Sequence, residues 1–314
     1  MTKDLHNAKT WSVSRRDFLR RSGGLIALGI SAPSLFASTS RPQNLQFRFG
    51  MLTDLHYAER DPWTTRFYRQ SLEKMRSCVR FMNTQELEFL VELGDLKDES
   101  TEPSEAETLT FLRDIEAAFA GFSGPRYHVL GNHDIDSISK DQFQENVQNT
   151  GISRERTWYS FNRGGLHFVT LDANFRKDGI PYDRGNFSWR DPNIPSSELE
   201  WLRRDLEENT LPTIVFCHQL LTDASPHCVI NAAEVRSILE SSGNVLAAFH
   251  GHKHEGDYAF INGIHYYTLE AVVEGSGPEN SAYAVVEVLR DHSLVVTGYL
   301  NARSGELAPA AEND

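Results

Sequence analysis

The sequence predicts an α/β protein with parallel strands in its first part and antiparallel strands in its last part. Short apolar runs alternate with amphipathic helical segments from residue 45 to about residue 250. Beyond that point the apolar runs follow one another without helices, and Asn262-Gly263 is a typical hairpin turn. Several early runs also end in Asp, His or Gly-Asp, as buried parallel strands do when they carry side chains to a site.

Three strands and two helices are predicted before residue 131. The strands, at residues 47–53, 89–93 and 127–130, are short and rich in apolar side chains. A helix at residues 66–81 is indicated because its apolar residues recur near one face. The helix at residues 105–119 follows Pro103-Ser104, a typical start signal.

The remaining elements are predicted in the same way. Residues 158–161 and 166–171 resemble a hairpin around Gly164-Gly165, and residues 175–195 have no period, as is typical of a long binding loop or a poorly ordered one. Ser197 and Glu200 have the spacing of a capping box for a helix at residues 197–207, and Asn231 is expected to cap a helix that ends near residue 240. The remaining predicted strands are at residues 214–217, 245–249, 258–261, 264–269, 283–289 and 294–299.

Composition limits the classes of function. The 314 residues, 39% hydrophobic and 24% charged, suit a globular protein of one large or two small domains. The formal net charge of -13 argues against a nucleic-acid surface, although bound cations could still create a site for a phosphorylated substrate. Cys78, Cys217 and Cys228 are too few for a disulfide framework; one pair is possible after export, but buried thiols are favoured.

The first 44 residues are predicted to be an export signal and a linker. Arg15-Arg16 precede Phe18-Leu19, a weakly apolar segment follows, and small residues end near Ala37. This pattern resembles a twin-arginine signal, which implies export by the Tat translocase to the periplasm or the exterior, without a stable membrane span. A basic amphipathic arm is the alternative. The folded domain is expected at residues 45–303, with a flexible tail at residues 304–314.

Side chains that can bind a metal follow five of the predicted strands. They are Asp54 and His56, Asp95, Asn132 and His133, His218, and His252 and His254. Because parallel strands have their carboxyl ends at one edge of a sheet, we expect these side chains to lie close together. Gly131 allows a tight turn before Asn132, and Asp134 can hold the His133 imidazole. Taken singly, each motif could also be a turn, a helix cap or a core histidine.

The ordered set D-x-H, G-D, G-N-H-D, H and G-H-x-H resembles the calcineurin-like metallophosphoesterases. This resemblance implies a four-layer αββα sandwich of two mixed sheets, with a binuclear metal centre. It places Asp54, His56 and His254 on the first metal, Asn132, His218 and His252 on the second, and Asp95 between the two. It also implies that His133 is a proton donor and that Asp134 orients it.

The ligand types suit a catalytic metal pair. Oxygen and imidazole ligands fit Mn, Fe or Zn, and no cysteine belongs to the set. Two cations would neutralise the charge of a phosphate and lower the pKa of a water molecule, while His133 protonates the departing oxygen. Asp98 stands where purple acid phosphatases place a metal-binding tyrosine, so no tyrosinate–iron site is expected.

A narrower resemblance, to the manganese-dependent ADP-ribose/CDP-alcohol diphosphatases, rests on the longer runs around Asp54 and His254. Animal members of that group carry Gln at the position of His56, which is a departure. Trp63, Arg66 and Arg69 are candidate substrate-binding residues; the alternatives are core filling for the tryptophan and a solvated helix face for the arginines. We expect hydrolysis of a nucleotide-type phosphodiester or diphosphate. The alternatives are a broad phosphomonoesterase and a non-catalytic protein that binds metal or phosphate.

Overall fold

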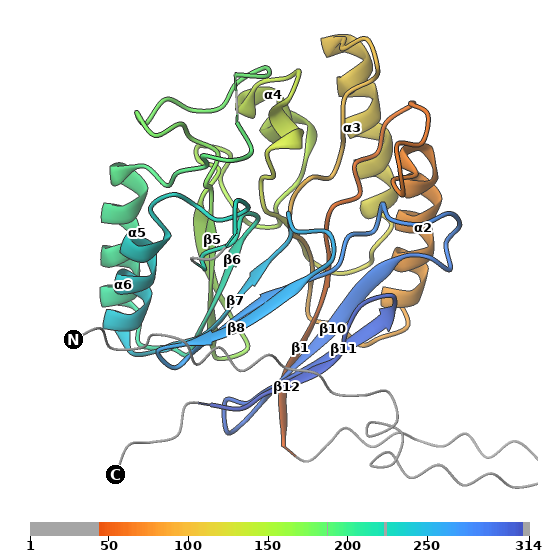
Figure 1. The fold of residues 1–314 in the computed structure, drawn as a ribbon. Coiled ribbons are helices and arrows are strands. Elements are labelled where there is room, and N and C mark those ends of the chain that lie inside the picture. Colours follow the sequence, from red (N-terminus) through yellow and green to blue (C-terminus); the bar gives the residue numbers. More distant parts are fainter. Residues whose placement is uncertain (1–43, 187, 223–224, 310–314) are drawn as a thin grey trace, which may run out of the picture.

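Two six-stranded sheets form the body of the protein (Figure 1). The computed structural model describes residues 44–186, 188–222 and 225–309, so the predicted export signal lies outside the described residues. The first sheet has the order β12 (Gly305–Leu307), β11 (Leu294–Leu300), β10 (Ala282–Leu289), β1 (Leu45–Leu52), β2 (Leu90–Glu92) and β3 (Arg126–His128). The second has the order β4 (Tyr159–Arg163), β5 (Leu166–Leu171), β6 (Thr213–Cys217), β7 (Val245–His250), β9 (Ile264–Thr268) and β8 (Asp257–Ile261).

Both sheets are mixed. In the first, β1, β2 and β3 are parallel, and β10 joins β1 antiparallel, followed by β11 and β12. In the second, β5, β6, β7 and β9 are parallel, and β4 and β8 are antiparallel edge strands. The predicted hairpin at Asn262-Gly263 joins β8 to β9, and both turn residues have positive φ.

Helices cover the outer faces of both sheets. On one side lie α2 (Ser71–Met82), α3 (Glu105–Phe119) and α4 (Lys140–Asn146), and on the other α5 (Ser196–Glu208) and α6 (Ala232–Ser242), as Figure 1 shows. Three apolar clusters separate these layers: one between each helical layer and its sheet, and one between the sheets. The predicted four-layer αββα sandwich is therefore confirmed.

These layers form because side chains along each strand point alternately to its two faces. In β10, Val286 faces the other sheet whereas Val285 packs under the helices, because successive side chains of a strand point to opposite faces. Between the sheets, the Phe89 ring lies 5.0 Å from the rings of both Phe49 and Phe168, measured between centroids. This aromatic layer packs the two sheets against each other.

Helix α2 begins later than the sequence predicts. A 3₁₀ turn, Tyr68–Gln70, precedes it, and residues 66 and 67 are not helical. Arg66 instead pairs with Trp63, and the N–H of Phe67 donates to the carbonyl of Val273 (3.1 Å). The apolar residues keep a helical spacing in this segment, but the backbone hydrogen bond to residue 273 holds it in a loop beside the site.

Other local predictions also need correction. The Ser197–Glu200 capping box does not form, because α5 starts after Pro195 without a side-chain cap. Asn231 does precede α6, but its side chain bonds the backbone of residue 194 instead. The predicted tail includes β12, since Leu307 is buried against the first sheet. Helix α4 was not predicted, although Ser139 and Gln142 form a capping box for it.

The other predicted helices and strands agree with the structure to within two residues at each end. Cys78, Cys217 and Cys228 are all free thiols, and the first two are buried. Within the part of the chain that the structure describes, no helix is long and apolar enough to cross a membrane.

Candidate metal centre

The predicted metal ligands meet at the carboxyl ends of the parallel strands in both sheets. They come from the turns after β1, β2, β3, β6 and β7. A first cluster consists of Asp54, His56 and His254, and a second cluster of Asp95, His218 and His252. Within each cluster, one ligand atom from every residue lies within 4.8 Å of the others.

One carboxylate oxygen joins the two clusters. Oδ2 of Asp95 lies 3.1 Å from Nε2 of His218 in the second cluster and 3.5 Å from Nε2 of His56 in the first. In the first cluster, Nε2 of His254 lies 3.1 Å from Nε2 of His56 and 3.4 Å from Oδ1 of Asp54. Asp95 therefore lies between the two clusters, where a bridging ligand would have to be.

The residues fit two divalent cations. Both polar atoms of the Asn132 amide and Nε2 of His252 are buried without a hydrogen-bond partner among the described residues. Burying such atoms costs free energy unless something coordinates them. Burial lowers the pKa of His252 to about 3, so its imidazole is neutral and keeps a lone pair for a metal.

The backbone at the site is strained. Asp54, His56, Asp95 and His252 all have φ between 47° and 68°, a left-handed conformation that non-glycine residues adopt rarely and at a cost of about 1–3 kcal/mol each. Gly131 is required for a different reason: a Cβ there would lie 2.1 Å from the backbone nitrogen of Asp95. The turns after β2 and β3 therefore pack against each other directly.

Three imidazoles are held by acceptors on their outer nitrogen. Nδ1 of His218 donates to the carbonyl of Leu93 (2.8 Å), and Nδ1 of His254 lies 2.6 Å from a carboxylate oxygen of Glu274. Nδ1 of His56 lies 3.2 Å from Asp98 in the same way. Such partners fix the tautomer and direct Nε2 toward the metal.

The structure gives Asp134 partners other than the predicted one. Its carboxylate accepts four backbone N–H groups, from Gly131, Asp95, Leu96 and Lys97. The acid beside the predicted proton donor is Asp98, whose Oδ1 lies 3.5 Å from Nδ1 of His133.

Asp98 therefore faces two imidazoles, those of His56 and His133. Burial opposes protonation of His133, but the carboxylates of Asp98, Asp95 and Asp136 outweigh it and raise the His133 pKa to about 9. The sequence held a signal for Asp98, which closes the run Gly94-Asp95-Leu96-Lys97-Asp98. It held none for Glu274, which no motif singles out.

The three predicted substrate residues differ in position. Trp63 is 59% exposed, so it does not fill the core, and the guanidinium of Arg66 lies 5.5 Å from its ring centroid. Nε of Arg66 is 3.7 Å from Glu274, the partner of His254. Arg69 instead forms exposed ion pairs with two nearby acids, as the solvated alternative describes.

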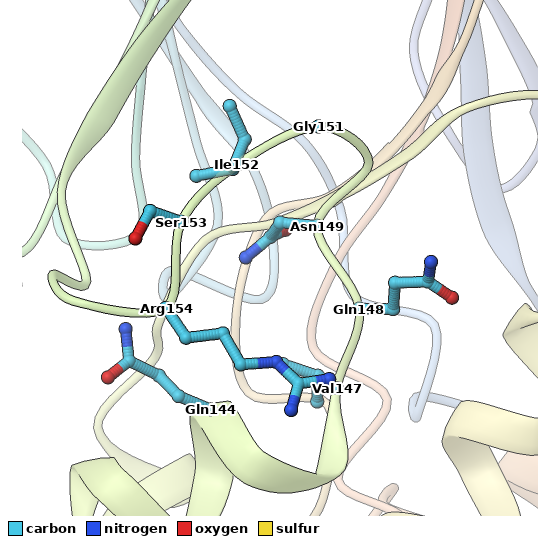
Figure 2. Close-up of a pocket in the computed structure, with 8 residues that line it drawn as sticks. All are labelled: Gln144, Val147, Gln148, Asn149, Gly151, Ile152, Ser153 and Arg154. Atoms are coloured by element: carbon cyan, nitrogen blue, oxygen red, sulfur yellow. The ribbon is translucent and has the colours of Figure 1, made fainter.

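A separate cavity of about 250 Å³ lies at the end of α4 and the loop that follows it (Figure 2). Its lining runs from Gln144 to Arg154 and contains amide, hydroxyl and guanidinium groups. None of its lining residues belongs to either ligand cluster, so the chemistry of the metal centre lies elsewhere.

A site with two ligand clusters, a shared carboxylate and an adjacent histidine defines the class: a metal-dependent hydrolase with two divalent ions. The chain belongs to the calcineurin-like phosphoesterase family, whose sequence profile matches residues 47–256. It is therefore a hydrolase of phosphate ester or anhydride bonds.

Individual relatives agree with this assignment. The chain is 26% identical to the manganese-dependent ADP-ribose/CDP-alcohol diphosphatase of Oryza sativa subsp. japonica, over 80% of this chain and 90% of the relative. It is 22% identical to the enzyme of that name from Xenopus laevis, over 82% and 89% of the two chains. The crystal structure of a dimetal phosphatase from Danio rerio shares the fold, with a TM-score of 0.69 and 21% identity over 84% of this chain and 99% of that one.

Proposed function

We propose that this enzyme hydrolyses a phosphodiester or diphosphate bond in a nucleotide-type small molecule. The observation that carries the proposal is Asp95, whose Oδ2 faces both ligand clusters while its Oδ1 accepts the N–H of His133 (2.8 Å). One carboxylate would thus contact both cations while it is held by the backbone of the predicted proton donor.

The chain's own residues have separate roles. The first cluster, the second cluster and Asn132 would hold the two cations, which supply charge neutralisation for the phosphate and a water of lowered pKa. His133, held near Asp98 and partly exposed, would give its proton to the departing oxygen. Its side chain combines solvent access with a carboxylate partner on Nδ1, and one of its ring nitrogens lies within 4.8 Å of ligand atoms of His56 and Asp95.

A nucleotide-type substrate is supported at the rim of the first cluster. Trp63 exposes an indole face that could stack on a base. Arg66 links this tryptophan to Glu274, and Glu274 to His254. The names of the relatives point to the same substrate class and to manganese. We therefore propose ADP-ribose or a CDP-alcohol as the substrate and Mn²⁺ as the metal.

The experiment that tests the reaction is His133→Ala, assayed with three substrates after metal analysis. We expect both metals to remain and turnover to fall by roughly 10²–10⁴-fold on a dialkyl-type phosphodiester, whose alkoxide leaves badly. The loss should be smallest for a nitrophenyl ester, which needs little protonation, and intermediate for ADP-ribose. His292→Ala, in an exposed turn of the described chain, is the matched control and should be unchanged.

An equal loss on all three substrates would show that His133 orients the phosphate or the metals instead. A screen of the wild-type enzyme against ADP-ribose, CDP-glycerol, cyclic nucleotides and simple monoesters tests the substrate class. Highest kcat/KM on simple monoesters would replace the proposal with a broad phosphomonoesterase.

We also propose that the protein is exported through the Tat translocase to the periplasm or exterior. The support is the run Arg15-Arg16 before Phe18-Leu19 and a weakly apolar segment. Changing both arginines to lysine should retain active precursor in the cytoplasm. The same change at Arg20 and Arg21 is the matched control; export of the first variant at the wild-type level would remove the proposal.

A further inference from the structure

Lys74 is a fully buried lysine on α2 whose ammonium group is surrounded by backbone carbonyls. The carbonyl oxygens of Val272 (2.7 Å), Glu274 (2.9 Å), Gly275 (2.7 Å) and Asn280 (2.8 Å) all lie within hydrogen-bond distance of Nζ, which shares its three N–H donors among them. These bonds satisfy a charge that would otherwise be costly to bury. All four acceptors belong to one segment, residues 272–280, which follows the second sheet and precedes β10.

The N–H groups of the same segment hold the turns that carry the first cluster. Those of Val272 and Val273 donate to the carbonyls of Thr53 and Asp54, each at 3.0 Å. Directly before the segment, the N–H of Ala271 donates to the carbonyl of His254, also at 3.0 Å. Lys74 therefore holds the segment through its carbonyl groups. The N–H groups of the segment and of Ala271 in turn hold the backbone of two predicted ligands, Asp54 and His254.

A side chain completes the connection. Glu274 lies between two of the carbonyls that Lys74 binds, and its carboxylate is 2.6 Å from Nδ1 of His254. The segment also bonds the loop of the predicted substrate residues, because the N–H of Gly275 donates to the carbonyl of Thr65 (2.8 Å). Moving residues 272–275 would thus displace the outer partner of a metal ligand and the loop beside it.

We propose that Lys74 is a positioning residue for the first metal: its ammonium group gathers the carbonyls of residues 272–280 and so holds Glu274 against His254. The proposal rests on the metal centre described above and not on the identity of the substrate. Lysine suits this role because its compact, tetrahedral ammonium can donate toward several carbonyls that converge on one point, whereas a guanidinium is planar and larger.

Without that charge, four carbonyl dipoles would face one another around a cavity. We expect the segment to relax, and the hydrogen bond between Glu274 and His254 to lengthen or break. Outer partners of metal-bound histidines typically contribute 10-fold to 100-fold in metal affinity. The affinity of the first metal site should therefore fall by roughly this factor, while that of the second site is unchanged.

The test is Lys74→Ala, measured by titrating Mn²⁺ into metal-free protein and resolving two binding sites. The Mn²⁺ affinity of one site should fall by at least about 10-fold. Glu274→Gln should lower the Mn²⁺ affinity of the same site. Because both changes break one connection, the double variant should be little worse than either single variant. Arg76→Ala, at an exposed position on the same helix, is the matched control and should bind both metals normally.

Chemical rescue tests whether the charge of Lys74 positions the segment or its side chain only fills space. Propylammonium replaces the atoms that Lys74→Ala removes, and it should restore Mn²⁺ affinity and turnover in that variant but not in Glu274→Gln. Propanol, of similar shape but uncharged, should not restore them. If Lys74→Ala does not fold, Lys74→Met keeps the apolar stem and the same Mn²⁺ titration applies.

A folded Lys74 variant that binds both Mn²⁺ ions with native affinity, at whatever thermal stability, would overturn the proposal, as would equal rescue by propanol. Mn²⁺ binding is measured without substrate. Failure of this proposal is therefore distinguishable from failure of the proposed reaction.

Discussion

Asp134→Asn offers a direct test of the role that the structure gives to Asp134. Oδ1 of this carboxylate accepts the N–H groups of Leu96 (2.9 Å) and Lys97 (3.3 Å), and Oδ2 accepts those of Gly131 (2.8 Å) and Asp95 (3.0 Å). The carboxylate thus ties the turn after β2 to the turn after β3. An asparagine has almost the same shape, but one carboxylate oxygen is replaced by an NH₂ group, which can only donate.

The magnitude follows from the number of donors left without an acceptor. If the amide oxygen keeps one pair of N–H groups, the NH₂ group faces the other pair. Each buried N–H without a partner costs about 1–3 kcal/mol, so the free energy of unfolding should fall by roughly 2–6 kcal/mol. Since total stabilities are about 5–15 kcal/mol, this is a large fraction.

Urea denaturation followed by circular dichroism measures this loss. We expect a lower midpoint for Asp134→Asn in metal-free protein, with metal binding recovering part of it by mass action. Asp114→Asn, at an exposed position of α3, is the matched control and should stay within about 0.5 kcal/mol of wild type. A variant with native stability and slow turnover would refute this reasoning and would instead favour a direct role of Asp134 on His133.

Three further predictions concern other buried acids and one histidine. Asp95→Asn should lose metal and activity together, because the remaining carboxylate compensates the cations poorly; two metals per chain with near-native turnover would contradict the bridging role. Asp98→Asn should slow turnover and weaken one Mn²⁺ site by roughly 10-fold or more, and a change in neither would exclude it as the imidazole partner. Burial lowers the pKa of His128, but the carboxylates of Glu116 and Glu92 outweigh this effect and raise the pKa to about 9. Protonated His128 therefore stabilises the fold fully below pH 6.5, and this contribution, up to about 3 kcal/mol, is lost as the pH rises through about 9. The free energy of unfolding of the metal-loaded protein should therefore fall less steeply with rising pH in His128→Gln than in the wild type. The same dependence on pH in both proteins would contradict the assignment.

Contacts that depend on strand direction could be predicted from the sequence. The predicted ligands follow apolar runs directly, and parallel strands bring such ends to one edge. This is why Asp54, Asp95, His218 and His252 fall into two clusters as predicted. The partners of β1 could not be predicted, since an apolar run does not specify its neighbour. Strand β10, more than 200 residues later, pairs with it.

Contacts that depend on side-chain direction were harder to predict. Asp134 follows His133 in the chain, which suggested that the two interact. In the 3₁₀ turn His133–Ile135, however, consecutive side chains diverge, and Asp134 turns toward the backbone of the neighbouring strand end. Asp98 reaches His133 from that other strand end. Lys74 was likewise predicted only as part of a helix, because nothing local indicates four carbonyls from residues 272–280.

The acids of the site differ in the groups that compensate their charge, and this difference indicates where metals would bind. Asp134 is surrounded by backbone N–H groups, while Asp98 and Glu274 each face the Nδ1 edge of an imidazole. Asp54 and Asp95 also accept backbone N–H groups, but each leaves one oxygen beside the Nε2 atoms of the clusters. Imidazoles whose Nδ1 already carries the proton present lone pairs there, which repel a carboxylate oxygen. Cations placed between these atoms would make both groups attractive, so the protein's own hydrogen bonds favour these positions for the two metals.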